Sequence, residues 1–169
     1  TDALVRRLMD LPQPLLLDAD GINALAGHMD EWERRRGRVT VLTPHEGEFL
    51  RVGGDLSQGR TAAAEDFARR SGAVVVLKGP GTVVAGPDGR CRVNTTGNCG
   101  MAKGGSGDVL SGVVLALLGL GMDAFDACCC AVWLHGRAGD LAAQERGQWG
   151  MTPTDLLERL PQALREVTE

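Results

Sequence analysis

The sequence predicts an α/β fold in which helices lie in layers against a largely parallel sheet. Three short apolar runs, at residues 15–17, 39–42 and 73–77, are typical of strands buried in a parallel sheet. Helix-forming segments alternate with these runs, and glycine-rich or polar residues follow them, which is the pattern of layered α/β domains. A β-hairpin is expected over residues 82–94, because Gly86-Pro87-Asp88-Gly89 is a turn sequence.

Length and composition indicate one globular domain spanning residues 1–169. Of the 169 residues, 43% are hydrophobic and 24% are charged, and the formal net charge is −4. The acidic balance, with no basic stripe, excludes sequence-independent nucleic-acid binding. No apolar run approaches the roughly 20 residues that span a membrane, so no membrane association is expected. Because the start carries no signal-peptide pattern, the expected location is the cytoplasm.

The five cysteines are expected to be reduced thiols. Their number is odd, and Cys128, Cys129 and Cys130 are consecutive in an apolar segment, which does not suit a disulfide framework. Cys91 and Cys99 lack the CxxC spacing of zinc ligands. We therefore predict no metal site built from the protein's own side chains.

Helices are predicted from apolar periodicity and from capping residues. They are expected at residues 3–9, 62–70, 109–118 and 126–141, and from Thr152-Pro153 onward. In the last helix, Pro161 is expected to kink or break the chain. The leucines of that helix are expected to face inward: Leu156, Leu157, Leu160 and Leu164. Trp133 and His135 are expected in the core, whereas the arginine-rich segment 31–38 is expected to be solvated.

The glycine-rich stretch NTTGNCGMAKGGSGDVLSG, from Asn94 to Gly112, ends where a strongly apolar helix begins. Such a turn gathers free N–H donors at the positive end of a helix, which suits a phosphate. Asp108, in the first turn of this helix, would repel a phosphate, so a role as the base that deprotonates a hydroxyl explains its placement. The alternative is an ordinary loop followed by a first-turn acid. The stretch matches neither a Walker A loop nor GxGxxG.

Polar residues follow each of the three predicted parallel strands, at the edge where open α/β sheets bind ligands. Asp20 and Asn23 follow the first strand, His45 follows the second, and Lys78 follows the third. Lys78, beside two glycines, suits a phosphate contact. The alternatives are a turn with Asx caps for the stretch that holds Asp20 and Asn23, a structural role for His45, and a surface position in a turn for Lys78.

Four motifs occur in order: LLLDADGINAL at 15–25, TPHEGE at 43–48, KGPGT at 78–82 and the glycine-rich stretch at 94–112. With them the chain, from about Ala3 to its end, resembles the ADP/ATP-dependent NAD(P)H-hydrate dehydratase family of the ribokinase-like superfamily. The resemblance implies a ribokinase-like α/β/α domain. Family members usually begin with a further segment that carries a GPGLG-type substrate loop, so the resemblance also implies that an N-terminal part is missing. The chain departs from the family pattern at two positions. Cys99 stands where the family commonly has Pro, and we expect it to loosen the turn. Lys103 stands where the family often has Thr, and we expect it to add a phosphate contact.

The resemblance implies a metabolite-repair enzyme that converts the 6-hydroxy hydrate of NADH or NADPH back to NAD(P)H. Its phosphoryl donor would be ADP, or ATP in some members, with Mg²⁺, and its assembly a homo-oligomer, often a tetramer. Asp108 would be the catalytic base, and the hydrate would also contact His45, with Asp20 and Asn23 as weaker candidates. The residues implied to bind the nucleotide are Lys78, Gly79, Pro80, Gly81, Thr82, Asn98, Gly104, Gly105 and Gly107.

Two alternatives share these motifs. The first is a small-molecule kinase of the same superfamily that phosphorylates a thiazole or pyrimidine alcohol and leaves a stable phosphate ester. The second is a nucleotide-binding module that is inactive by itself because the N-terminal part is absent.

Overall fold

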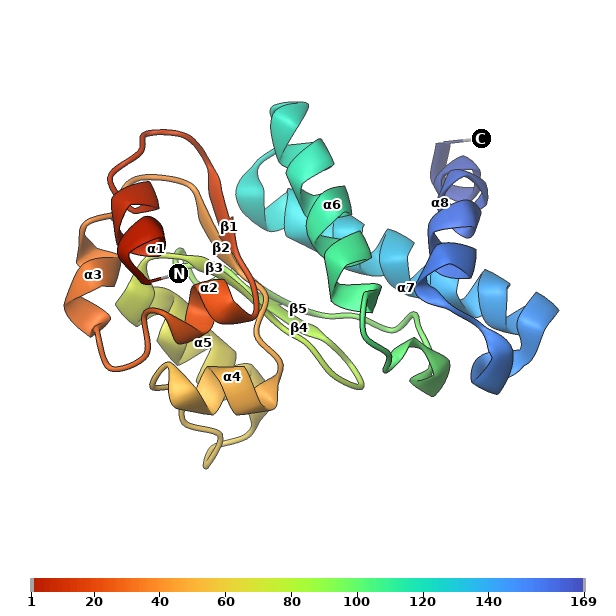
Figure 1. Ribbon diagram of the computed structural model, residues 1–169, viewed down its shortest axis with the longest axis horizontal. Helices are drawn as coiled ribbons and strands as arrows, with labels where there is room; N and C mark the ends of the chain where they lie inside the picture. Colours follow the sequence, from red (N-terminus) through yellow and green to blue (C-terminus); the bar gives the residue numbers. More distant parts are fainter. Residues whose placement is uncertain (1, 169) are drawn as a thin grey trace.

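The computed structural model describes residues 2–168 and contains a five-stranded sheet with helices on both faces (Figure 1). The strands lie side by side in chain order: β1 (Leu15–Leu17), β2 (Thr40–Leu42), β3 (Val74–Leu77), β4 (Val83–Ala85) and β5 (Cys91–Val93). β1, β2 and β3 are parallel, whereas β4 and β5 form an antiparallel hairpin. The predicted α/β fold, its three parallel strands and its hairpin are confirmed.

The helices divide into two groups along the chain. The first group is α1 (Asp2–Leu8), α2 (Asp20–Asn23), α3 (Met29–Glu33), α4 (Glu46–Arg51) and α5 (Arg60–Ser71). The second group is the 3₁₀ turn η1 (Cys99–Met101), α6 (Ser106–Gly119), α7 (Ala124–Gly150) and α8 (Pro153–Thr168). Within residues 2–168, no helix combines the length and apolarity needed to cross a membrane.

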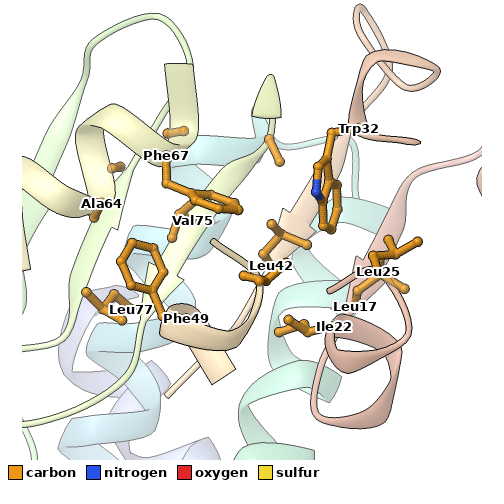
Figure 2. Packing of buried hydrophobic residues seen from close by; sticks show 14 of the residues in the cluster. Leu17, Ile22, Leu25, Trp32, Leu42, Phe49, Ala64, Phe67, Val75 and Leu77 are labelled. Atoms are coloured by element: carbon orange, nitrogen blue, oxygen red, sulfur yellow. The ribbon is translucent and has the colours of Figure 1, made fainter. Parts of the chain in front are cut away.

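One face of the sheet packs against the first group of helices. Figure 2 shows Leu42, Val75 and Leu77 of the strands beside aromatic side chains of α3, α4 and α5. The rings of Phe49 and Phe67 have centroids 5.3 Å apart, within the range of a favourable aromatic pair. This aromatic cluster fixes α4 and α5 against the strands that carry the predicted site.

The opposite face packs against α6 and α7. Val74 and Val76 point to this face, whereas Val75 and Leu77 point to the other, as the period of two in a strand requires. All four residues of β3 are therefore buried. Their partners on α6 include Leu110 and Val114, which come from its predicted apolar face.

The last two helices differ from expectation. α7 extends to Gly150 across a kink at Gly147, where φ is 72°, and α8 runs without a break through Pro161. The expectation that all four leucines of α8 face inward is wrong, because Leu157 is 53% exposed and Leu164 is 48% exposed. α8 packs on α7 through a narrower stripe formed by Leu156, Leu160 and Ala163.

Arg35 corrects the expectation that segment 31–38 is a solvated surface. Its side chain is 2% exposed, and its guanidinium donates to the Thr40 hydroxyl and to backbone carbonyls. Those carbonyls belong to Met9, Leu11, Gln13 and Val39. Arg35 therefore ties the loop between α1 and β1 to the start of β2. The energetic cost of burying its charged guanidinium is offset because all three of its nitrogens donate to acceptors.

Arg35→Lys is expected to lower the free energy of unfolding by about 2 kcal/mol, because one ammonium cannot reproduce the planar fork and leaves carbonyls without donors. Urea unfolding followed by far-UV circular dichroism measures the change. Arg36→Lys is the matched control, since Arg36 is exposed and donates only to the Arg70 carbonyl, among the contacts of the described residues. Equal stability of the two variants would contradict the role assigned to Arg35.

Candidate functional site

The carboxyl ends of β1 and β3 meet the N-terminus of α6 at one point. Lys78, which follows β3, donates from Nζ to Oδ1 of Asp18, which follows β1, at 2.7 Å. Gly107 in the first turn of α6 lies directly against this ion pair. A Cβ at Gly107 would lie 3.2 Å from Asp18 Oδ2 and 3.6 Å from Lys78 Nζ. The structure thus brings Lys78 and the GSGD turn together, as the sequence predicts, and adds Asp18.

His45 begins α4 next to the same edge. Its Nδ1 accepts from the backbone N–H groups of Gly47 at 2.9 Å and Glu48 at 3.3 Å. Its own backbone N–H donates to Glu48 Oε2 at 2.8 Å, which completes a capping box with Glu48. Because Nδ1 is an acceptor, the ring proton lies on Nε2, 3.3 Å from Glu48 Oε1. The side chain remains 53% exposed, so the ring is both a cap and an accessible surface.

The KGPGT loop is shaped by Arg60, a residue that no sequence pattern marked as functional. Its guanidinium donates to the Leu77 carbonyl at 2.9 Å and to the carbonyl of Pro80. The loop needs glycine at two points, because φ is 150° at Gly79 and 63° at Gly81. The Thr82 hydroxyl donates back to the Gly79 carbonyl at 3.0 Å. The loop is therefore held in one conformation at the end of β3.

The TGN segment is anchored to α7 by Asp140, a second residue that no sequence pattern marked as functional. Asp140 accepts from the Gly97 backbone N–H at 2.9 Å and from Asn98 Nδ2 at 3.0 Å. Asn98 Oδ1 accepts from the backbone N–H of Gly100 at 3.0 Å and caps η1. The Asn98 side chain thus holds the loop, and its predicted nucleotide contact remains a prediction.

Small residues of α7 let this loop lie against the helix. A Cβ at Gly136 would lie 2.7 Å from the carbonyl carbon of Thr96, and a Cβ at Gly139 would lie 2.8 Å from Met101 Cγ. Both distances are too short for a side chain. The spacing of Gly136, Gly139 and Asp140 in an otherwise apolar helix was the available signal that α7 supports the loop.

Asp108 lies in the first turn of α6, just beyond Gly105, whose φ of 96° gives the turn its shape. The residue is exposed, and within residues 2–168 no side chain pairs with its carboxylate. An unengaged carboxylate at a helix N-terminus, beside free N–H groups, is available to take a proton. Gly104 and Gly105 lie in the same turn, as expected.

His135, on α7, supports the first turn of α6 through a hydrogen bond. Its Nε2 donates to the Ser106 carbonyl at 2.9 Å, since a carbonyl only accepts. Burial, assisted by the nearby charge of Lys78, lowers the pKa of His135 to about 4. The imidazole is therefore neutral at physiological pH, and the expectation that His135 belongs to the interior is confirmed.

This pKa predicts that acid destabilises the protein. The folded-state pKa lies below the ordinary value of 6.5, so between pH 6.5 and 4 the unfolded chain binds more protons and stability falls as pH falls. From pH 7 to 5, His135 should account for a loss of roughly 1–2 kcal/mol. Urea unfolding at both pH values tests this. His135→Gln, which keeps a donor for Ser106 without titrating, should lose less; equal losses would contradict it.

Other predicted residues lie around this edge with partners of their own. Asp20 is exposed at the start of α2, and Asn23 Oδ1 accepts from Arg51 at 2.6 Å. Lys103 donates to the Trp149 carbonyl at 2.9 Å and to that of Met151, so its ammonium holds the end of α7, and its expected phosphate contact remains a prediction. Cys99 places its thiol 2.8 Å from Gln148 Oε1. Over the described ranges, no three His, Cys, Asp or Glu side chains cluster as a metal site.

Comparison with known proteins identifies the family. The family model described as NAD(P)H-hydrate dehydratase matches residues 1–162. The "Bifunctional NAD(P)H-hydrate repair enzyme Nnr" of Thermofilum pendens is 47% identical over 161 residues, which are 93% of this chain and 30% of that protein. The "ADP-dependent (S)-NAD(P)H-hydrate dehydratase" of Bacillus subtilis is 40% identical over 88% of this chain and 53% of its own length.

A solved structure agrees with this match. The ADP/ATP-dependent NAD(P)H-hydrate dehydratase from Bacillus subtilis, co-crystallized with ATP/Mg²⁺, aligns with a TM-score of 0.82 and 36% identity. The alignment covers 96% of this chain and 58% of the other. This chain therefore spans about a third of the bifunctional relative and little more than half of the two dehydratase chains. The ribokinase-like fold and the resemblance of the four motifs are confirmed, and the chain belongs to the NAD(P)H-hydrate dehydratase family.

Proposed function

We propose that this chain carries the phosphoryl-transfer part of an enzyme that dehydrates the 6-hydroxy hydrate of NADH or NADPH, with ADP or ATP as the phosphoryl donor. One observation carries the proposal. The unengaged carboxylate of Asp108 lies one residue after Gly107, which lies beside the Asp18–Lys78 ion pair. A base, a cation and a helix N-terminus are thereby gathered at one edge of the sheet, where a phosphoryl group and a hydroxyl can meet.

The chemistry begins at the C6 hydroxyl of the hydrate. Asp108 takes its proton while the oxygen attacks the terminal phosphoryl of the nucleotide, so that AMP leaves from ADP, or ADP from ATP. The backbone N–H groups of Gly105 and Gly107 and the Lys78 ammonium stabilise the charge on the transferred phosphoryl. The C6–O bond then breaks, phosphate leaves with the bonding electrons, and loss of a proton from C5 restores the ring double bond.

The remaining predicted residues divide between two ligands. His45, Asp20 and Asn23 are proposed on the side of the hydrate. The nucleotide side comprises the KGPGT loop, from Lys78 to Thr82, and the glycines that precede Asp108. The nucleotide contact of Asn98 would be made from a side chain already fixed by Asp140. Assembly as a tetramer comes with the family resemblance and belongs to the same proposal. We propose the cytoplasm as the location.

Mg²⁺ fits this site as a partner of the nucleotide. The carboxylates at the edge, Asp18 and Glu48, already flank Lys78, so the ion would be held mainly by phosphate oxygens, as is usual for Mg²⁺. When bound, it would neutralise charge on the phosphates. The chain's own contribution is to orient the phosphates and to move the proton through Asp108.

A turnover assay on NADH hydrate tests the proposal. The hydrate is incubated with Mg²⁺ and ADP or ATP, using the 169-residue chain and, in parallel, the complete translated protein. Nucleotide-dependent recovery of NADH absorbance with equimolar phosphate release is expected. Reactions without nucleotide control for spontaneous dehydration. A stable phosphate ester in place of free phosphate would overturn the dehydratase in favour of the kinase, and ADP binding without turnover in either form would favour the inactive module.

A further inference from the structure

Asp18 occupies a strained turn at the end of β1. The Gly21 backbone N–H donates to the Asp18 carbonyl at 2.8 Å, which closes a four-residue turn. Its second residue, Ala19, has φ 46° and ψ −116°, the geometry of the first central position of a type II′ turn, which normally requires glycine. Such strain persists only where the surroundings enforce it, and it gathers at functional sites.

The turn directs the Asp18 carboxylate between two elements of the proposed site. Oδ1 accepts from Lys78 Nζ at 2.7 Å, and Oδ2 lies where a methyl group on Gly107 would be 3.2 Å away. The side chains of Asp18 and Lys78 are 18% and 23% exposed, so solvent screens their attraction only in part. Among the described residues, Asp18 is thus a carboxylate that pairs with Lys78 and also lies beside Gly107, in the first turn of α6.

Lys78 depends on this contact for its position. Its side chain is a flexible four-carbon stem, and its charge next to the positive end of α6 is unfavourable without a counter-charge. Glu48 Oε2, on the other side of the ammonium, lies 3.9 Å away, beyond hydrogen-bond distance. Asp18 therefore accepts a hydrogen bond from one of the three ammonium N–H groups and leaves the others free to donate to an anion.

We propose that Asp18 is a positioning residue for phosphate binding. It holds the Lys78 ammonium at the N-terminus of α6, so that the ammonium and the helix N–H groups converge on one phosphoryl group of the nucleotide. Asp18 acts through Lys78 and needs no contact with the nucleotide itself. Any effect of Asp18 on hydrate turnover rests on the proposed function. Its effect on nucleotide affinity can be tested without hydrate turnover.

A double-mutant cycle tests this. ADP affinity is measured by calorimetry for the wild-type protein, Asp18→Asn, Lys78→Met and the double variant. Each single variant is expected to weaken ADP binding about 10-fold or more, and the double variant to be no more than about threefold weaker than Lys78→Met, because Asp18 acts only through the lysine. Asp30→Asn, an exposed aspartate of α3, is the charge-matched control and should bind like the wild type. Additive losses would overturn the inference.

Ala19→Gly provides a variant that retains the fold. Glycine relieves the strained turn, so the melting temperature should be no lower than that of the wild type, while a looser Asp18 should weaken ADP binding at least threefold. Wild-type affinity in Ala19→Gly would count against the inference. The hydrate assay separates the two proposals. If the effects of Asp18→Asn and Lys78→Met on ADP affinity are not additive but the protein does not turn over the hydrate, only the proposed function is wrong. If the protein turns over the hydrate but the two effects on ADP affinity are additive, only the inference is wrong.

Discussion

Asp108→Asn is expected to lower kcat for the NADH hydrate by about 10²–10⁴-fold, the usual contribution of a positioned base. The amide has the shape of the carboxylate but cannot take the hydroxyl proton. ADP affinity should be unchanged or higher, because the substitution removes a negative charge from the end of α6 that faces the phosphates. Steady-state kinetics with calorimetric ADP binding measure both quantities on the same preparation.

The control for this variant is Asp126→Asn. Asp126 is also an exposed aspartate in the first turn of a helix, α7, so both substitutions change the helix-dipole interaction alike. Asp126 lies beside Arg90 near the β4–β5 turn, at the opposite edge of the sheet from Lys78. We expect wild-type kinetics from it. An Asp108→Asn protein that retained more than about a tenth of the wild-type kcat would rule out Asp108 as the base.

Gly136→Ala is expected to destabilise the protein by about 2 kcal/mol and to weaken nucleotide binding. The new methyl group would lie 2.7 Å from the carbonyl carbon and 2.8 Å from the carbonyl oxygen of Thr96. Both are backbone atoms, so the TGN segment must move away from α7, which costs about 1–3 kcal/mol in overpacking. The Thr96 hydroxyl would also lose its hydrogen bond to the Trp133 carbonyl, 3.0 Å in length.

Gly112→Ala is the matched comparison for this substitution. Gly112 is a helical glycine of α6, and a Cβ there meets nothing within 4 Å. The change should raise stability by about 0.5–1 kcal/mol, because alanine is the better helix former. Urea unfolding of the two variants should therefore show shifts of opposite sign. Stabilisation by both would mean that the loop does not depend on close contact with α7.

The elements that the sequence predicted are those governed by local patterns. The run Val74–Leu77 is apolar on both faces, and a buried parallel strand is the structure that suits it. GPDG fixed the hairpin, and the helix after Gly107 followed from apolar spacing. The edge of the sheet where ligands bind followed in turn, because parallel strands place their carboxyl ends together.

The residues that were missed act across long separations in the chain. Arg35 reaches the Gln13 carbonyl, Arg60 reaches the Leu77 carbonyl, and Asp140 reaches Gly97. Their acceptors and donors are backbone groups, which have no sequence signature. Asp18 was passed over for Asp20 because only the geometry of Ala19 shows which aspartate faces Lys78. Leu157 and Leu164 were misplaced because helical periodicity does not reveal how much of an apolar helix face the neighbouring helix covers.

The β4–β5 hairpin has a consequence for how the chain tolerates changes in length. β4 begins at Val83, level with Leu77, and β5 returns to the same level at Val93. One residue added within either strand would shift the register, exchange the two faces and displace the TGN segment that follows. Residues added between Gly86 and Gly89 would only lengthen a turn at the far edge. We expect insertions among related chains, and those made by protein engineers, to be tolerated at that turn and not in the strands.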